Sequence, residues 1–222
     1  MLKLKKWMFN PCQTACHVLS DETGECVIVD ACPYYRNERA SLVEYIEEEH
    51  LKPVRNLLTH GHFDHLLGND LVRDRFGLLP EVHRGDAPLM ERVQGRIYEA
   101  FGESNFPYEV PMPERYLESD EVVSFGNHQL KVIHTPGHSP GSCFFYCEEE
   151  GIAFSGDTLF FMNIGRSDLL GSSKEELANS LRFITEFLPE DTVIYPGHTK
   201  KTTIGRERER NPNLRKAILG EL

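Results

Sequence analysis

The chain has 222 residues, a net charge of −11, and 40% hydrophobic and 27% charged residues, so it has the composition of an ordinary globular protein. The acidic balance disfavours nucleic acid as a partner, because the phosphate backbone would be repelled. No apolar run approaches the roughly eighteen residues of a membrane span, so we expect no membrane partner.

The N-terminus is basic, but no apolar stretch typical of a secretory leader follows it. We therefore expect a cytoplasmic protein whose six cysteines are reduced thiols. Cys12 and Cys16 stand four residues apart, as do Cys143 and Cys147, so on an extended strand each pair shares one face. Neither pair has the tighter spacing of a zinc ribbon or a redox motif, and we interpret all four as buried small apolar residues.

The first part of the chain follows the strand, helix, strand order of a βαβ unit. We expect strands over residues 2–9, 16–20, 25–30 and 54–58, with a hairpin turn at Thr23-Gly24. A helix is expected from Asn37 to about His50, with an apolar stripe on one face. Asp30 closes the third strand, and the sequence leaves open whether it supports a ligand histidine or only caps the turn.

The stretch that follows residue 58 concentrates metal-compatible side chains. Three histidines and a carboxylate stand within six positions, at His60, His62, Asp64 and His65. Imidazole and carboxylate groups suit zinc and similar ions, whereas ordinary solvated loop histidines rarely reach this density. An apolar strand precedes the cluster and helical spacing up to Gly77 follows it, so the cluster lies on a strand-to-helix turn. One ion cannot comfortably accept all four side chains, so we infer two adjacent ions.

The middle of the chain is less regular. We expect a strand over residues 79–83 and a helix that Asp86 caps and that continues through Ile97. Residues 101–116 are rich in aromatic residues and proline without periodicity, which predicts a long loop. The sequence leaves open whether this loop is a lid over the site or a simple connection.

The remaining part is richer in strands, which we expect over residues 122–125, 128–133, 143–147, 152–155 and 192–195. Ser172 and Ser173 are each followed three residues later by a glutamate, so they predict capping boxes for a helix through Phe187. Three more metal-compatible residues follow apolar runs, at His138, Asp157 and His198. Neighbouring glycines would let the backbone approach a site there.

Four motifs resemble those of the metallo-β-lactamase superfamily and span nearly the whole chain in the family order. They are His60-Gly61-His62-Phe63-Asp64-His65, Thr135-Pro136-Gly137-His138-Ser139, Gly156-Asp157-Thr158 and Pro196-Gly197-His198. The resemblance implies one domain over residues 1–222, a four-layer αββα sandwich of the α/β (α+β) class, and a site in a cleft at one edge of the two sheets. It also implies that His60, His62 and His138 bind one ion, that Asp64, His65 and His198 bind a second, and that Asp157 bridges both.

The chemistry of two adjacent ions agrees with that allocation. A bridging carboxylate offsets part of the repulsion between two cations. A water between the ions loses a proton near neutral pH and becomes the nucleophile, and one ion polarises the substrate carbonyl. We therefore expect a metallo-hydrolase without a protein nucleophile, with Asp64 and Asp157 as catalytic carboxylates. Zinc is the expected metal, and iron and manganese are the alternatives.

Within the superfamily the chain looks most like the short, single-domain members of the glyoxalase II group of thioester hydrolases. The similar stretches are residues 156–160, 164–168 and 202–207. This resemblance implies a small-molecule thioester such as S-lactoylglutathione as substrate and Arg166 as the residue that holds a glutathione carboxylate. Lys200 is a second candidate for an anionic substrate. The chain departs from the group after His198, where Thr199-Lys200-Lys201 stands, and this leaves the carrier thiol open.

The alternative is a persulfide dioxygenase of the same fold, which shares the Gly165-Arg166-Ser167-Asp168 stretch. Such an enzyme holds one iron through one histidine of the 60–65 run, His138 and Asp157, but it usually has Pro-Ala-His near its C-terminus. A secreted zinc lactamase is disfavoured, because it usually has a cysteine where Asp157 stands. Two ions would favour hydrolysis, and one iron with oxygen uptake would favour the dioxygenase.

Overall fold

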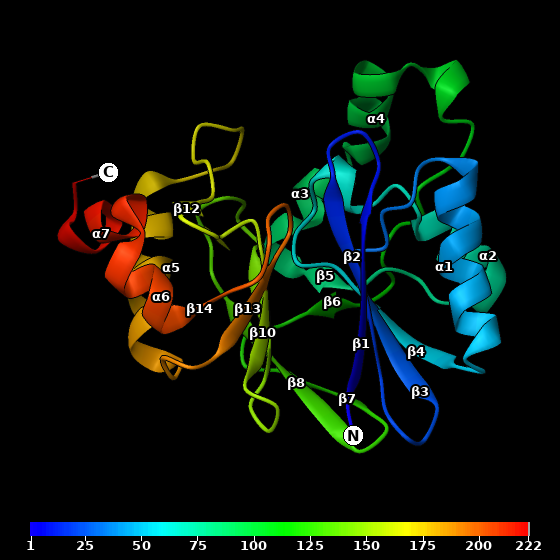
Figure 1. Ribbon diagram of the computed structural model, residues 1–222. Coiled ribbons are helices and arrows are strands. Elements are labelled where there is room, and N and C mark those ends of the chain that lie inside the picture. The colour runs from blue at the N-terminus through cyan, green and yellow to red at the C-terminus, as the bar shows by residue number, and fades with distance from the viewer. Residues whose placement is uncertain (222) are drawn as a thin grey trace.

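Two β-sheets face each other at the centre of the computed structural model, which describes residues 1–221 (Figure 1). The first sheet has the order β1-β2-β3-β4, with bounds Lys3–Phe9, Thr14–Ser20, Glu25–Val29 and Lys52–Leu57. The second has the order β14-β13-β10-β9-β8-β7. From β7 to β14 its strands are Val122–Phe125, His128–His134, Cys143–Cys147, Ile152–Gly156, Val193–Pro196 and Thr202–Thr203. Short pairs are formed by β5 (Val82–His83) with β6 (Tyr116–Leu117) and by β11 (Leu159–Phe160) with β12 (Asn163–Ile164).

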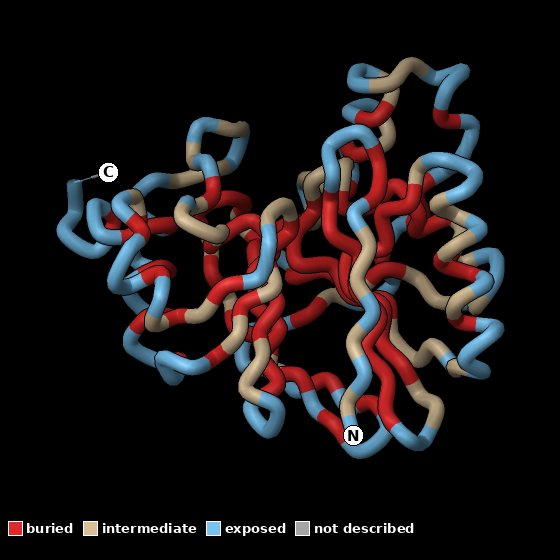
Figure 2. The backbone as a smooth tube through the Cα atoms, in the orientation of Figure 1, coloured by how far each residue is buried: buried red, intermediate tan, exposed pale blue. Residues whose placement is uncertain are grey.

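Helices cover the outer face of each sheet. On the first sheet, Leu42 of α1 (Arg36–Glu48) and Val72 of α2 (Asn69–Phe76) pack against the strands. On the second, Leu181 of α5 (Lys174–Phe187) and Leu214 of α7 (Pro212–Leu219) do so, and α6 (Ile204–Arg210) precedes α7. Side chains of both sheets form the core between them, and Figure 2 shows burial concentrated along the strands while the outer sides of the helices are exposed. The predicted αββα sandwich is confirmed.

Helix α1 begins one residue earlier than predicted, at Arg36, and ends at Glu48. Asn37 does not cap it. Instead the Glu38 carboxylate reaches back and accepts hydrogen bonds from the backbone N–H groups of Tyr34, Tyr35 and Asn10. This acid therefore fixes the start of the helix and also anchors the end of β1. The parallel pairing of β3 with β4 confirms the βαβ unit.

The predicted helix from Asp86 is in fact two helices, α3 (Ala87–Met90) and α4 (Val93–Phe101). Asp86 is the N-cap residue by position, but its side chain makes no capping hydrogen bond. The expected strand over residues 79–83 is limited to Val82–His83. Residues 101–116 form a connection with one short 3-10 turn, Glu103–Asn105.

The expected strands and helix of the second part are confirmed with small shifts of their ends. The hairpin between β7 and β8 pairs Phe125 with His128. Ser173 caps α5 by accepting a hydrogen bond from the backbone N–H of Glu176 at 3.2 Å. No helix within residues 1–221 combines the length and the apolar character that a membrane crossing requires.

Candidate metal centre

Loops that follow strands of both sheets bring seven side chains to one edge of the sandwich. The first four lie between β4 and α2, on a turn that contains the 3-10 segment Phe63–His65, and the others follow β8, β10 and β13. They form three overlapping trios whose ligand atoms lie within 4.8 Å of one another: His60, His62 and His138; His60, His65 and Asp157; and Asp64, His65 and His198. The structure thus brings together every residue that the sequence nominates as a ligand.

The separations between ligand atoms suit coordination to shared ions. His198 Nε2 lies 3.2 Å from Asp157 Oδ2 and 3.3 Å from Asp64 Oδ2, and His65 Nε2 lies 3.5 Å from Asp157 Oδ1. On the other side, His138 Nε2 lies 2.9 Å from His62 Nδ1 and 3.6 Å from Asp157 Oδ2. Two donors at zinc distances in a tetrahedral arrangement lie about 3.3 Å apart. The observed spacing therefore fits the edges of such a coordination shell.

Protein groups fix which nitrogen each of three histidines presents to the centre. Nδ1 of His138 lies 2.9 Å from the carbonyl of Arg166, Nδ1 of His198 lies 3.2 Å from the carbonyl of Cys12, and Nδ1 of His65 lies 3.0 Å from Asp30 Oδ2. Carbonyls and carboxylates only accept, so each Nδ1 carries the proton and donates it. Each Nε2 is therefore left to face the centre, as a ligand histidine requires.

Several buried polar atoms in this cluster have no hydrogen-bond partner in the part of the protein that the structure describes. Within the described chain, Nε2 of His60, Nε2 of His65 and Oδ1 of Asp157 are buried and make no hydrogen bond. Buried polar atoms are almost always satisfied, so three orphans in one cluster call for an external partner. A divalent cation accepts electron pairs from all three atoms at once, and the residues present therefore fit a metal site.

Asp30 resolves the alternative that the sequence left open. Its carboxylate accepts the His65 Nδ1–H and also hydrogen bonds from the backbone N–H and the hydroxyl of Thr59, both at 2.8 Å. It therefore supports a ligand histidine and holds the start of the metal-binding turn.

Asp86 is a supporting residue that the sequence interpretation missed. Its fully buried carboxylate accepts hydrogen bonds from Gly61 N–H at 2.7 Å, Ser139 Oγ at 2.8 Å and Gly141 N–H at 2.6 Å. It thereby ties the turn between His60 and His62 to the loop that carries His138. No local pattern reveals this role, because the partners lie 25 to 55 residues away.

Gly197 explains why the last ligand follows a glycine. A Cβ at this position would lie 2.3 Å from Asp157 Oδ1 and 2.8 Å from His65 Cε1. Any side chain would therefore displace two of the converging residues. The sequence expectation that glycine lets the backbone approach the site is confirmed here.

The cluster divides electrostatically into two sides. Burial lowers the pKa of His60 well below its ordinary value and that of His62 to about 4, so both rings are neutral and offer lone pairs. Burial also opposes charge on His198, but hydrogen bonds to Asp157 and Asp64 outweigh it and raise the pKa of His198 to about 10. The negative charge that holds a proton on His198 favours a metal cation in the same position.

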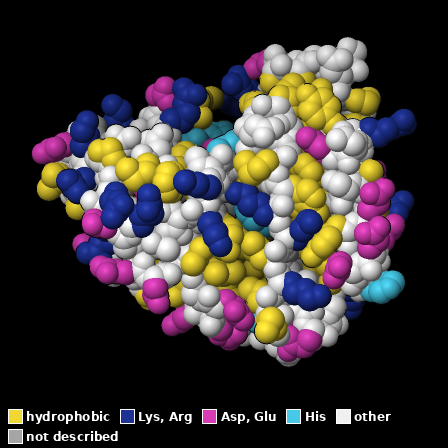
Figure 3. All heavy atoms as spheres, viewed as in Figure 1, with side chains coloured by type: hydrophobic (Ala, Val, Ile, Leu, Met, Phe, Trp, Pro, Cys, Tyr) yellow, Lys and Arg dark blue, Asp and Glu magenta, His cyan; other side chains and the backbone are white. Residues whose placement is uncertain are grey.

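A cleft of about 900 Å³ opens above the cluster. Figure 3 shows histidine side chains in the hollow between the two helix-covered halves, with Lys and Arg side chains on both of its sides. Besides ligand residues, the walls include Cys12, Leu89, Arg92, Arg96, Arg166 and Leu170. The cleft therefore combines polar, cationic and apolar surface over the candidate metal centre.

The position of Cys12 differs from the sequence interpretation. Cys16, Cys143 and Cys147 are buried as expected, but Cys12 is exposed and lines the cleft. The reason is local, because residues 10–13 form the turn between β1 and β2, and β2 starts only at Thr14. The strand geometry assumed for the first cysteine pair does not hold.

The two residues expected to bind substrate lie in different settings. Arg166 lines the cleft, but its Nε and Nη2 donate to the two carboxylate oxygens of Asp168 at 2.7 and 2.9 Å. The ammonium of Lys200 lies over the ring of Phe161, 4.0 Å from its centroid, and Lys200 is not among the described residues that line the cleft. A substrate role for either residue stays a prediction.

The segment 101–116 connects α4 to β6. Phe106 is fully buried and stacks on Tyr34, with ring centroids 6.2 Å apart. Within residues 1–221, none of the residues that line the cleft comes from this segment. The cleft is flanked instead by α4, which precedes the segment.

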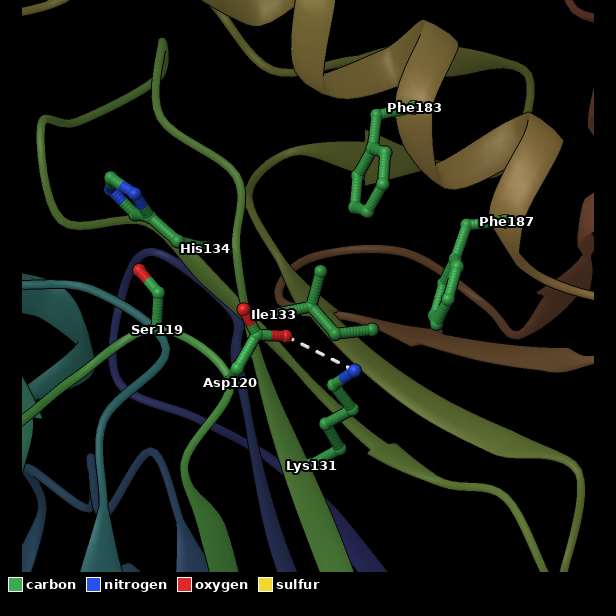
Figure 4. A pocket seen from close by; sticks show the side chains of 7 residues that line it. All are labelled: Ser119, Asp120, Lys131, Ile133, His134, Phe183 and Phe187. Carbon is green, nitrogen blue, oxygen red and sulfur yellow. Dashed lines mark ion pairs between the residues drawn. The ribbon is translucent and has the colours of Figure 1, made fainter.

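A second cavity, of about 240 Å³, lies between β8 and α5 (Figure 4), and none of its described lining residues is a candidate ligand. Ser119 lines it and lies 3.4 Å from His83 Nε2, while His83 Nδ1 accepts a hydrogen bond from Gly85 N–H. His83 Nε2 therefore carries the proton and cannot activate Ser119 as a base. Lys131 is paired with Asp120 at 3.1 Å. These contacts give the second cavity no activated nucleophile.

Comparisons with known proteins agree with the geometry. A model of the metallo-beta-lactamase superfamily matches residues 9–198. The hydroxyacylglutathione hydrolase GloC of Haemophilus influenzae is 32% identical over 206 residues, which cover 91% of this chain and 92% of GloC. The crystal structure of BLEG-1 B3 metallo-beta-lactamase is 33% identical with a TM-score of 0.78, covering 95% of this chain and 98% of that one. The di-iron-bound form of TTHA1623 is 32% identical with a TM-score of 0.79, covering 94% and 98%.

The four-layer sandwich and its cluster of histidines and aspartates at one edge define an enzyme of the metallo-hydrolase class. The chain belongs to the metallo-beta-lactamase superfamily, whose members bind divalent metals.

Proposed function

We propose that the protein hydrolyses a small thioester, such as S-lactoylglutathione, at a centre of two divalent metal ions. Zinc is the proposed metal, with iron and manganese as alternatives, since TTHA1623 is described in a di-iron form. The proposed ligands are His60, His62, Asp64, His65, His138, Asp157 and His198. The observation that carries the proposal is the convergence of these seven ligand groups beneath an open cleft.

Bound ions would supply an activated water and would polarise the thioester carbonyl. Neighbouring protein groups orient the ligand side chains. Asp157 lies between the two sides of the cluster, with Oδ1 near His65 and Oδ2 near both His138 and His198. Asp64 is oriented by Thr14, whose hydroxyl donates to Oδ2 at 2.8 Å. The carboxylates are therefore held before any substrate enters.

The thioester assignment is supported by the similarity to GloC and by the three arginines among the residues that line the cleft. Hydrolysis breaks the carbon–sulfur bond, adds water oxygen to the acyl carbon and releases a thiol. A persulfide dioxygenase needs only three ligands for its single iron, whereas this chain also assembles Asp64, His65 and His198. A centre of two ions therefore accounts for more of the converging side chains.

A β-lactam is a second candidate substrate, because the BLEG-1 structure is 33% identical over 95% of this chain. Its cleavage would use the same cluster on an amide instead of a thioester. The two substrates differ in the leaving group, a tethered amine in one case and a free thiol in the other.

Metal analysis of the purified protein combined with turnover assays tests the proposal. We expect close to two ions per chain and release of free thiol from S-lactoylglutathione, with far slower opening of a chromogenic cephalosporin. Oxygen uptake with glutathione persulfide and a single iron would move the assignment to the dioxygenase. Faster turnover of the cephalosporin than of every thioester would move it to a lactamase.

A further inference from the structure

One wall of the cleft is a single face of helix α4 and the residue before it. Arg92, Gly95, Arg96 and Glu99 all line the cleft. Their spacing of three and four residues places them on the same side of the helix. This face therefore presents Arg92 and Arg96, with Gly95 between them in sequence, to any molecule that reaches the metal centre.

Gly95 has no conformational or packing reason to be glycine within the described chain. It lies inside α4, where glycine weakens a helix relative to alanine, and its φ is not positive. A Cβ at this position would meet no atom within 4 Å. The open space over Gly95 is thus continuous with the cleft and leaves room for a ligand to lie against the helix backbone.

Arg92 differs from the other two arginines of the cleft. Arg166 is paired with Asp168, and Arg96 is paired with Glu99. Among residues 1–221, the Arg92 side chain has no ion-pair or hydrogen-bond partner, although it lines the cleft. Its five N–H donors form a planar fork that matches a carboxylate or a phosphate. Arg92 is exposed at the cleft wall, where Glu91 beside it also lies, so its guanidinium is free to contact an anionic group of a ligand.

Most of the remaining wall surface is apolar, apart from Glu91, Arg166 and the ligand residues. Leu89 and Val93 line the cleft beside the arginines, and Leu169 and Leu170 line it from the loop that follows β12. Leu170 is 73% exposed, so its side chain is in contact with water in the absence of a ligand. A ligand that covers these side chains gains from their burial, in addition to an ionic contact at the rim.

We propose that Arg92 determines specificity by binding an anionic group of the carrier thiol, whose chain crosses α4 over Gly95. The inference rests on the proposed thioester hydrolysis and names its substrate class. The substrates are thioesters whose thiol portion bears a carboxylate or a phosphate remote from the sulfur. Arg92 acts on binding of the carrier, and the reacting carbonyl lies at the metal centre.

The test compares three substrates: S-lactoylglutathione with carboxylates, a short acyl-coenzyme A with phosphates, and a neutral alkyl thioester. Arg92→Gln is expected to lower kcat/KM for the preferred anionic thioester by about 10- to 100-fold, mostly through KM. The neutral thioester should change less than about twofold. Binding of the corresponding non-hydrolysable thioether, measured by calorimetry, should weaken by a similar factor. Arg182→Gln, on the outer helix α5, is the matched control and should change none of these values.

Gly95 provides a second, independent variant. Gly95→Ala should fold with at least the wild-type melting temperature, because a Cβ there meets no atom within 4 Å, and for Gly95→Leu the same is expected because leucine also favours a helix over glycine. Gly95→Leu should nevertheless weaken the anionic thioester more than the neutral one. Equal losses on all substrates, or an Arg92→Gln enzyme that matches the Arg182→Gln control, would overturn the inference while leaving thioester hydrolysis intact. A wild-type enzyme that hydrolyses no thioester and binds no anionic thioether would overturn both.

Discussion

Replacing Asp86 by asparagine would test whether a buried carboxylate holds the metal-binding turn in place. One oxygen accepts from Gly61 N–H and Ser139 Oγ, and the other accepts from Gly141 N–H. Asparagine keeps one acceptor oxygen but places an NH₂ donor where the second oxygen was. At least one buried N–H or O–H donor of the loop would then face another donor.

The magnitude follows from those contacts. A hydrogen bond to a charged group contributes about 1.5–3 kcal/mol, and the remaining bonds become weaker neutral ones, so we expect a loss of about 2–4 kcal/mol. For a protein of this size each kcal/mol corresponds to about 2–4 °C, which gives a fall in Tm of about 4–16 °C. Because Gly61 lies between His60 and His62, metal affinity should also fall by about 10- to 100-fold.

Thermal unfolding followed by circular dichroism measures the first effect, and competition with a chromophoric chelator measures the second. Asp74→Asn is the matched control, because Asp74 is exposed and pairs only with its neighbour Arg73 among the described ion pairs. The control should change stability by less than about 1 kcal/mol. An Asp86→Asn protein with the Tm and metal affinity of the control would refute the supporting role of this carboxylate.

Asp157→Ala should abolish both hydrolysis and stoichiometric metal binding while the far-ultraviolet circular dichroism spectrum stays unchanged, because Asp157 lies between the two sides of the cluster. A variant with near-native kcat would contradict this role. His17→Leu should raise stability by about 1–3 kcal/mol, because His17 is buried and neither ring nitrogen has a partner in the described chain; a lower Tm would show that the ring is satisfied in solution. Burial opposes charge on His128, but hydrogen bonds to Glu150 and Asp21 outweigh it and raise its pKa. The stabilisation by charged His128 is therefore complete below about pH 6.5 and is lost as pH rises through the folded pKa, and His128→Gln should remove this slope from urea titrations at a series of pH values.

Most of the elements and the ligand cluster were predictable because their signals are local. The turn from His60 to His65 carries four metal-compatible side chains in six positions, and each of the other three follows an apolar strand. Hydrophobic periodicity located the strands and α5, and Ser173 marked the start of that helix by a capping pattern that the structure reproduces.

The supporting residues were not predictable in the same way, because their roles depend on contacts between distant segments. Asp86 looks like a helix cap in sequence, yet its carboxylate accepts from Gly141, 55 residues away. Glu38 displaces Asn37 as the residue that fixes α1 because it also binds the backbone of Asn10, 28 residues earlier. The break between α3 and α4, at Glu91 and Arg92, contains no glycine or proline that would announce it in the sequence.

The site exists only where the two halves of the chain meet. The first sheet leads into the turn with His60, and the second sheet leads into the loops with Asp157 and His198. A backbone hydrogen bond of 2.6 Å from Ala15 N–H to the carbonyl of Gly197 joins the two sheets directly beside these residues. Neither half can hold a full set of ligands alone, so a bound ion would stabilise the packing of one sheet on the other. Metal binding and the stability of the αββα sandwich are therefore thermodynamically linked, and the supporting carboxylates of Asp30 and Asp86 contribute to both.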